Sequence, residues 1–173
     1  SLPEARMQVY FLDNEDFFKR KSIFEDADQQ AFEDNSDRMV FFCKGVLETV
    51  KKFGWPPDIV HCHGWMTSLI PLYLRTAYKS EPLFEQAKVI YSAYEGKNYA
   101  AEFNDSFATK ASINNLSEDD LSAYVEDDQV DLEKGVSKYA DALIKGGEEL
   151  DERMSARLQV PEPAPVADKD RMS

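Results

Sequence analysis

The stretch of sequence that decides the fold is Pro57-Asp58-Ile59-Val60-His61-Cys62-His63-Gly64-Trp65-Met66-Thr67-Ser68-Leu69. Residues 58–62 form a short apolar run that is typical of a buried β-strand, and the polar turn after it leads toward a helix. Because side chains alternate along a strand, His61 and His63 are predicted to share one face while Cys62 points to the other. The stretch therefore indicates a strand that carries two imidazoles to the start of a helix.

The clearest helix lies upstream of this strand. Apolar residues recur at helical spacing over 39–53, and Gly54 is predicted to end the helix. The candidates for its N-cap are Asp34, Asn35 and Ser36, whose side-chain oxygens can accept hydrogen bonds from the first turn.

The remaining elements continue the alternation of strand and helix. Residues 14–33 are predicted to form a long loop with short helical turns, whose phenylalanines fold back onto the body. Apolar strands alternating with helices predict an α/β protein: a three-layer, Rossmann-like, mostly parallel sheet with helices on both faces. In such sheets ligands bind beyond the carboxyl ends of the strands. Further strands are predicted over 7–12, 88–92 and 142–145, and further helices from about 67 and over 117–124, 130–139 and 147–158.

Charge and composition narrow the classes of function. The chain has 173 residues, with 33 acidic against 20 basic side chains and a net charge of −13, so nucleic acid is not an expected partner. No apolar run approaches the ~20 residues that cross a membrane, and residues 1–6 lack the order of a signal peptide. Two cysteines are too few for a disulfide framework, which favours a reducing, cytoplasmic setting.

The side chains that could bind a ligand each have a structural alternative. His61 is either a ligand contact or a hydrogen-bonded histidine in a packed strand end, and Trp65 either packs or stacks against a sugar. Asp34 and Asn35 either border a binding site or cap a helix. Cys62 has only histidines beside it, so a nucleophile is not predicted. A metal site is not predicted either, because no carboxylate or Cys-x-x-Cys pair stands at a matching spacing.

The histidine turn also carries a resemblance to a known family. Residues 61–66, His-Cys-His-Gly-Trp-Met, resemble the His-Ala-His-Asp-Trp-His turn of bacterial glycogen and plant starch synthases, which are GT-B glucosyltransferases. Asp34-Asn35-Ser36-Asp37-Arg38-Met39-Val40-Phe41-Phe42 is similar to the family's Asp-Asn-x-x-Arg-Phe-x-x-Phe. Further matches are Gly54-Trp55-Pro56-Pro57-Asp58, Leu69-Ile70-Pro71-Leu72-Tyr73-Leu74 and Lys134-Gly135-Val136-Ser137-Lys138-Tyr139-Ala140-Asp141.

This resemblance implies transfer of glucose from ADP-glucose or UDP-glucose to an α-1,4-glucan, with retention and without a cofactor. It does not choose between the two donors. No residue is predicted to be catalytic, because Gly64 stands where the family has an aspartate and Ala93 where the family has a histidine that contacts the donor glucose. The substrate-binding residues that it implies are Asp34, Asn35, His61, His63, Trp65 and Tyr94.

The resemblance also implies that parts of the family's machinery lie outside this sequence. The family's Lys-Thr-Gly-Gly phosphate loop does not occur here, and a second Rossmann-like domain is needed for donor binding. Residues 1–158 are expected to be part of the amino-terminal domain with the first strands missing, either as a fragment or as a short, divergent homologue, and 159–173 a disordered acidic, proline-rich tail. Alone, this chain is expected to be inactive. The alternative is an inactive glucan-binding or assembly module derived from that domain.

Overall fold

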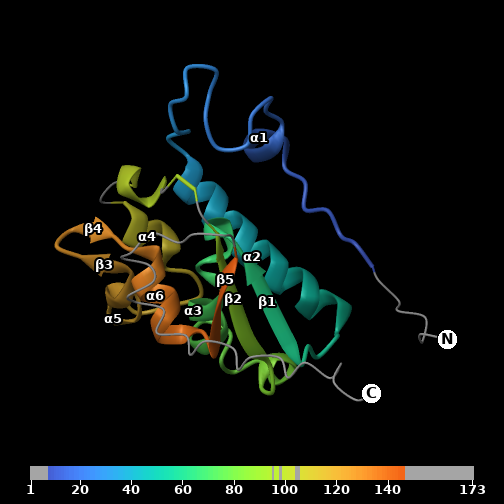
Figure 1. Cartoon of the computed structure of the whole chain (residues 1–173). Coiled ribbons are helices and arrows are strands. Elements are labelled where there is room, and N and C mark those ends of the chain that lie inside the picture. The colour runs from blue at the N-terminus through green and yellow to red at the C-terminus, as the bar shows by residue number, and fades with distance from the viewer. Residues whose placement is uncertain (1–7, 95, 98, 104–105, 147–173) are drawn as a thin grey trace, which may run out of the picture.

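The computed structural model describes residues 8–94, 96–97, 99–103 and 106–146. Its centre is a parallel sheet of three strands in the order β1-β2-β5, formed by β1 (Ile59–His63), β2 (Lys88–Tyr94) and β5 (Ala142–Gly146) (Figure 1). The three predicted strands after residue 57 are therefore confirmed, and so is the α/β class with a parallel sheet.

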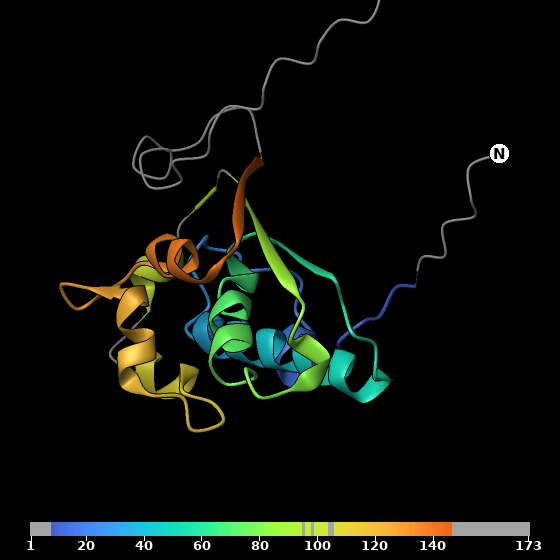
Figure 2. The ribbon, with the colours of Figure 1, turned by 90° about the horizontal axis from the view of Figure 1, so that it is seen from below.

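The described helices cover one face of this sheet. Figure 2 shows α2 (Asn35–Phe53), α3 (Ile70–Arg75) and α6 (Leu132–Tyr139) on the same side of the three strands. The opposite face is open, with Ile59 59% and Ile144 43% exposed. The described part of the chain thus shows one of the two helical layers that the sequence predicts.

The core lies between the sheet and these helices, and burial of its apolar side chains is the main force that holds the layers together. The buried side chains recur every four residues along α2 and every two residues along β2, as expected for one face of a helix and of a strand. Its fully buried members include Met39, Cys43, Leu47, Cys62, Leu69, Leu72, Tyr73 and Val89.

Helix α2 has the predicted ends but lacks a side-chain cap at its start. It begins at Asn35, four residues before the predicted stripe, and ends as predicted at Gly54, whose φ of 69° is left-handed. Asp34 occupies the N-cap position, but its side chain makes no capping hydrogen bond. The side-chain capping role predicted for Asp34 is therefore wrong, because its carboxylate binds the Arg20 guanidinium instead.

The strand predicted over 7–12 is also wrong for the described residues 8–12, which form no regular structure. Alternation alone does not make a strand, because the backbone also needs a neighbouring strand to pair with. After it come α1 (Glu15–Phe18) and an isolated bridge between Glu25 and Ala31. The phenylalanines of this segment do fold back as predicted, since the rings of Phe17 and Phe18 lie 5.3 and 6.0 Å from that of Phe41 on α2.

The helix predicted from about residue 67 comes in two pieces. A 3₁₀ turn, η1 (Trp65–Thr67), is followed by α3, which has Pro71 in its first turn. A second 3₁₀ turn, η2 (Pro82–Phe84), precedes β2.

Between β2 and β5 the chain forms several short elements. They are η3 (Tyr99–Glu102), α4 (Phe107–Ala111), α5 (Glu118–Leu121), η4 (Ser122–Tyr124), β3 (Val125–Glu126), β4 (Gln129–Val130) and then α6. Helix α5 begins with a capping box, in which Ser117 and Asp120 exchange hydrogen bonds. Strands β3 and β4 form a hairpin that the sequence analysis does not predict. Its two-residue turn, Asp127 and Asp128, has positive φ at both positions.

The helix predicted over 147–158 and the tail lie outside the described residues. Among the residues that are described, no helix combines the length and the apolar character that a membrane crossing requires.

Gly135 on α6 is needed for close packing. Tyr124 is fully buried, and a Cβ added at Gly135 would lie 2.3 Å from its ring. The Tyr124 hydroxyl donates to the Ser68 carbonyl oxygen at 2.7 Å, so the ring cannot move away without breaking a buried hydrogen bond.

We therefore expect Gly135→Ala to lower the free energy of unfolding by about 2 kcal/mol or more, because the added methyl overpacks the core. Chemical denaturation measures this. The matched control is Gly45→Ala in α2, where the added Cβ meets only the mobile end of Leu12, at 3.3 Å. Equal effects at the two glycines would contradict this account of α6.

Candidate functional site

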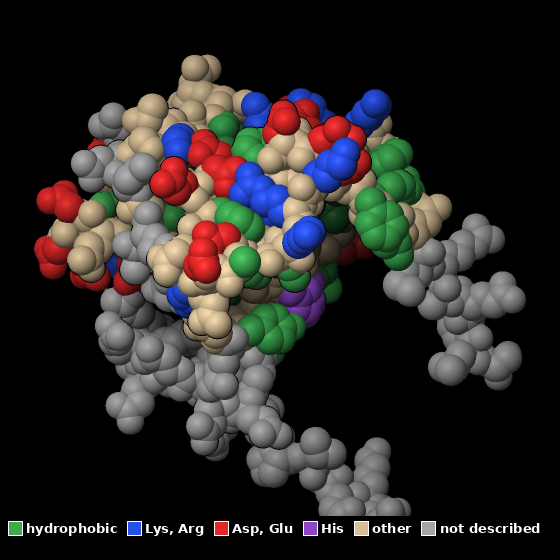
Figure 3. Space-filling view, turned by 90° about the horizontal axis from the view of Figure 1, so that it is seen from above, with side chains coloured by type: hydrophobic (Ala, Val, Ile, Leu, Met, Phe, Trp, Pro, Cys, Tyr) green, Lys and Arg blue, Asp and Glu red, His purple; other side chains and the backbone are tan. Residues whose placement is uncertain are grey.

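Two imidazoles are stacked at the carboxyl end of β1. The ring centroids of His61 and His63 lie 4.0 Å apart with an interplanar angle of 34°. Both side chains are exposed, while Cys62 between them is 1% exposed. The predicted alternation is confirmed, and imidazole surface is visible from outside the molecule (Figure 3, purple). His61 is hydrogen-bonded but exposed, so it is not a histidine in a packed strand end.

Each imidazole is held by a hydroxyl group from β2. His61 Nε2 lies 2.8 Å from Ser92 Oγ, and His63 Nδ1 lies 2.7 Å from the Tyr94 hydroxyl oxygen. The parallel register places His63 opposite Ser92, so alternate residues of the two strands face the same side. Two hydroxyls spaced two residues apart thus match two imidazoles with the same spacing.

The turn after β1 depends on Gly64. Its φ of 78° and ψ of 171° lie in a region that only glycine occupies readily. The Gly64 N–H donates to the Ser92 carbonyl oxygen at 3.1 Å, and its own carbonyl accepts from the Thr67 hydroxyl at 2.8 Å. An aspartate would have space at this position but a strained backbone.

Ala93 lies on the other side of β2 from the histidines. It is 1% exposed and belongs to the buried core, whereas its neighbours Ser92 and Tyr94 lie on the side of the histidines, Ser92 buried and Tyr94 exposed. A larger side chain at this position would point toward the core side of the strand end rather than join the two imidazoles.

Trp65 forms the centre of an aromatic cluster next to this turn. Its ring centroid lies 4.9 Å from that of Phe24, 5.2 Å from Tyr99 and 6.2 Å from Phe103. Its indole nitrogen is buried and has no hydrogen-bond partner among the residues that the structure describes. The packing alternative for Trp65 is thus present, and Phe24 brings the 14–33 segment onto it.

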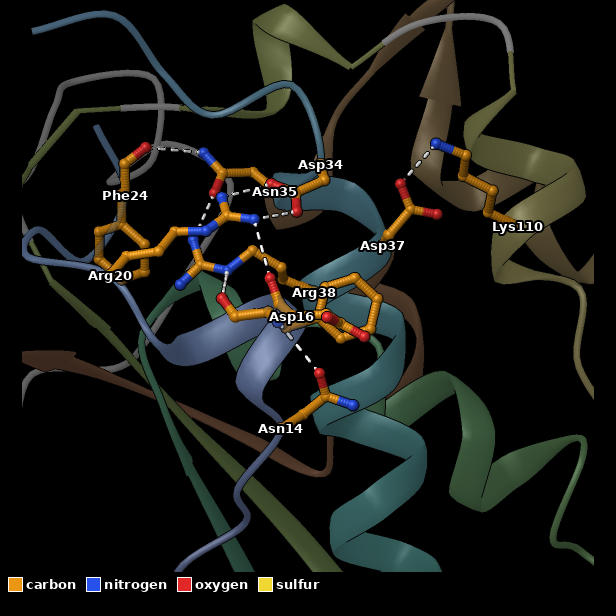
Figure 4. A network of polar contacts seen from close by, with 10 residues as sticks. Asn14, Asp16, Arg20, Phe24, Asp34, Asn35, Asp37, Arg38 and Lys110 are labelled. Atoms are coloured by element: carbon orange, nitrogen blue, oxygen red, sulfur yellow. Dashed lines mark hydrogen bonds and ion pairs between the residues drawn. The ribbon is translucent and has the colours of Figure 1, made fainter. Parts of the chain in front are cut away.

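Asp34 and Asn35 hold the same segment to the start of α2 (Figure 4). Arg20 donates to both carboxylate oxygens of Asp34, one of them at 2.8 Å, and this contact lowers the pKa of Asp34. Asn35 Nδ2 donates to the Phe24 carbonyl oxygen at 3.0 Å.

Arg38 completes this network from inside. It is 3% exposed, and burial lowers its pKa, with the nearby charge of Arg20 acting in the same direction. Its Nη1 donates to Asn35 Oδ1 at 2.7 Å and its Nε to the Phe17 carbonyl oxygen at 2.9 Å. A buried guanidinium with these partners fixes the backbone of the 14–33 segment.

The predicted site residues fall into two groups. His61, His63 and Tyr94 lie together on the open face of the sheet. Of the other three, Asn35 and Trp65 both contact Phe24, whereas the carboxylate of Asp34 binds Arg20. Within the described residues, no hydrogen bond or ring contact joins the two groups directly.

Three residues that contact the predicted site residues were not themselves predicted: Ser92, Phe24 and Arg20. Ser92 could have been found, because it stands two residues before Tyr94 on a predicted strand, as His61 does before His63. Phe24 and Arg20 carry no comparable signal, since their contacts join residues far apart in the sequence.

Burial removes Cys62 from consideration as a nucleophile, because desolvation raises its pKa to about 12. In the described part of the chain, no group of three or more histidine, cysteine, aspartate or glutamate side chains is placed to hold a metal ion.

The fold and the site together define a Rossmann-like α/β protein whose ligand edge is the carboxyl end of its parallel sheet. A sequence model of the family described as "Starch synthase catalytic domain" matches residues 1–147. The chain belongs to this family.

The relatives with matching sequence are bacterial. The chain is 43% identical over 95 residues to a glycogen synthase of Pelodictyon phaeoclathratiforme and 46% identical over 91 residues to one of Chlorobium phaeobacteroides. These matches cover 54% and 52% of this chain but 19% of each relative, so the chain spans about a fifth of their length.

A solved structure confirms the fold. The catalytic domain of starch synthase IV from Arabidopsis thaliana superposes with a TM-score of 0.52 at 19% sequence identity, over 73% of this chain and 25% of that one.

The lowered pKa of Asp34 predicts a pH dependence. In the folded state its pKa lies below that of an unfolded aspartate, so its contribution is complete above about pH 4 and is lost as the pH falls through the folded pKa. We expect Asp34→Asn to lower the free energy of unfolding by about 1 kcal/mol at neutral pH, and the difference from wild type to shrink below pH 4. Denaturation at several pH values measures it. A difference that does not change with pH would contradict the Arg20–Asp34 contact.

Proposed function

We propose that this chain is part of the amino-terminal domain of a glycogen-synthase-type glucosyltransferase, and that the edge formed by His61, His63 and Tyr94 contacts the glucosyl group. The observation that carries the proposal is the pair of stacked, exposed imidazoles at the carboxyl end of the sheet, each held by a hydroxyl of the next strand. Family membership supplies the reaction: transfer of glucose from ADP-glucose or UDP-glucose to an α-1,4-glucan.

The geometry suits recognition of a sugar hydroxyl. Because Tyr94 engages Nδ1 of His63, Nε2 is the ring nitrogen that remains for a ligand. Ser92 engages Nε2 of His61, which leaves its Nδ1. A fixed imidazole loses little conformational freedom when a ligand binds, and its orientation is set before the transition state forms.

Other parts of the reaction require more than the described residues. Donor binding is assigned to a second Rossmann-like domain, and phosphate contacts to a loop outside this sequence. The solved Arabidopsis relative is bound to ADP and acarbose, which supports nucleotide and sugar ligands for the family. The two buried, free cysteines fit a cytoplasmic setting.

The alternative is a glucan-binding or assembly module without catalysis, and two observations favour it. Gly64 adopts a backbone conformation that disfavours the family's aspartate, and Ala93 places no polar group at the strand end. A non-catalytic module of this kind keeps the sugar contact of His63 but lacks the groups that stabilise charge during glucose transfer.

Incorporation of glucose into glycogen, measured on the protein at its full natural length with ADP-glucose and with UDP-glucose as donors, tests the proposal. We expect His63→Ala to lower kcat on the order of 10²-fold and Tyr94→Phe to lower it about tenfold, because the phenol only positions the imidazole. In the His63→Ala background, Tyr94→Phe should have no further effect. Ile23→Ala, a substitution of an exposed side chain in the 14–33 segment, is the control.

Two outcomes separate the candidate functions. If wild-type protein incorporates no glucose but binds glycogen in a His63-dependent manner, the binding module is correct. If His63→Ala changes neither incorporation nor binding, both proposals for this edge are wrong.

A further inference from the structure

Part of the loop before α2 contacts both turns that follow the histidine edge of the sheet. Residues 24–32 form a small hairpin, in which an isolated bridge joins Glu25 to Ala31. At its tip, a carboxylate oxygen of Asp26 accepts hydrogen bonds from two backbone N–H groups of the hairpin, at 2.8 and 3.0 Å. The hairpin therefore has a shape of its own, fixed by contacts within nine residues. We call residues 24–32 the edge hairpin.

An aromatic contact joins the edge hairpin to both turns. The ring centroid of Phe24 lies 4.9 Å from that of Trp65 and 5.2 Å from that of Tyr99, and those of Trp65 and Tyr99 lie 5.2 Å apart. Trp65 follows His63 by two residues, and Tyr99 belongs to the chain that leaves β2. Figure 4 shows how Phe24 is held at its backbone, where its carbonyl oxygen accepts from Asn35 Nδ2. Three rings, one from each segment, thus pack the hairpin against the two turns.

A polar contact ties the edge hairpin to the turn after β2. Glu25 Oε1 accepts from Lys97 Nζ at 2.7 Å and from the Tyr99 hydroxyl at 3.0 Å. Lys97 also donates to the Gln29 carbonyl oxygen at 3.2 Å, so it contacts the hairpin at two points. The hydrogen bond from Lys97 is the largest cause of a lowered pKa of Glu25, whose carboxylate therefore stays charged to a lower pH than that of an ordinary glutamate.

The turn after β2 matters because backbone pairing alone does not fix Tyr94 beside His63. The ladder between β1 and β2 ends where His63 lies opposite Ser92, two residues before Tyr94. On its other side Tyr94 pairs with Gly146 of β5. Its side chain is 49% exposed and reaches β1 through the hydrogen bond between its hydroxyl and His63 Nδ1. The direction of the chain beyond Tyr94 therefore decides whether the phenol meets the imidazole, and Lys97 is only three residues further on.

We propose that Glu25 is a positioning residue for the sugar edge. Through Lys97 and Tyr99 it fixes the direction in which the chain leaves β2. This keeps the Tyr94 hydroxyl on the His63 imidazole, whose orientation glucose transfer requires. The proposal rests on the proposed function, which makes His63 a sugar contact, and it gives the edge hairpin a part in the reaction although the hairpin itself does not contact the sugar.

Glucose incorporation by the protein at its full natural length tests this role. We expect Glu25→Ala to lower kcat about three- to tenfold and to leave the KM for the donor within about twofold, because Glu25 orients a group used in transfer and does not bind the donor. In the Tyr94→Phe background, Glu25→Ala should have no further effect. The double variant Glu25→Lys with Lys97→Glu, which restores the ion pair in reverse, should recover most of the lost kcat.

The matched control is an ion pair of similar geometry in the last turn of α2. Glu81 and Lys51 lie 2.6 Å apart with side chains 32% and 42% exposed, against 2.7 Å, 25% and 45% for Glu25 and Lys97. Because this pair does not reach the edge hairpin or the turns, Glu81→Ala should leave kcat unchanged.

Nuclear magnetic resonance measures the same coupling without turnover. In ligand-free protein with labelled histidine, Glu25→Ala and Tyr94→Phe should shift the His63 signal in the same direction. The signal of His61, which Ser92 holds, should shift less. Glu81→Ala should move neither signal.

The outcomes distinguish this proposal from the one on which it rests. A His63 signal that responds to Glu25→Ala in a protein without transferase activity supports the positioning role and removes only the transfer function. A His63 signal that does not respond, or effects of Glu25→Ala and Tyr94→Phe on kcat that multiply in full, overturns the role.

Two further results would also decide against it. Equal losses of kcat in Glu25→Ala and Glu81→Ala would show a general effect on stability, and a raised KM at unchanged kcat would show direct contact of Glu25 with a ligand. Circular dichroism identifies any loss of fold. Glu25→Gln, which keeps a hydrogen-bond acceptor but removes the charge, replaces an alanine variant that does not fold and should lower kcat in the same direction.

Discussion

The alternation of side chains along β1 is the constraint on which the rest of the structure depends. Cys62 must enter the core for α2 and α3 to pack against the sheet, and this fixes His61 and His63 on the opposite face. A shift of the strand by one residue would bury both imidazoles and expose the thiol. The packing of the core and the presentation of the site are therefore set by the same register.

Parallel pairing with β2 then completes the site. Because His63 lies opposite Ser92, the open face of β2 carries Ser92 and Tyr94, and each of these hydroxyls holds one imidazole. The same register sends Ala93 into the core, which explains why the position assigned to the family's donor-contacting histidine does not reach the His61–His63 pair here. Substitution at Gly64 is restricted by backbone conformation rather than by space.

The spacing of apolar residues predicts the type of each element and the face on which its side chains lie. These predictions are confirmed for α2, for the three strands of the sheet and for the shared face of His61 and His63. The spacing does not show which distant segment an element contacts. The Arg20–Asp34 pair joins residues fourteen apart, so a carboxylate that looks like a helix cap is used to hold the 14–33 segment. The segment 8–12 alternates like a strand, yet Tyr10 packs on Phe53 and Trp55 without a strand to pair with. The resemblance to the family supplied the substrate class, which no pattern of spacing could give.

The two histidines are the only ones in this sequence, and both lie at the proposed sugar edge. Nuclear magnetic resonance of the protein at its full natural length, with histidine selectively labelled and His61→Ala and His63→Ala used to assign the two signals, reports on that edge directly. The account predicts that both imidazole signals shift when ADP-glucose and maltotriose bind together, and that Tyr94→Phe reduces the shift of His63. If calorimetry shows that the ligands bind and both imidazole signals nevertheless stay unchanged, the proposed role of His61 and His63 in sugar binding is contradicted.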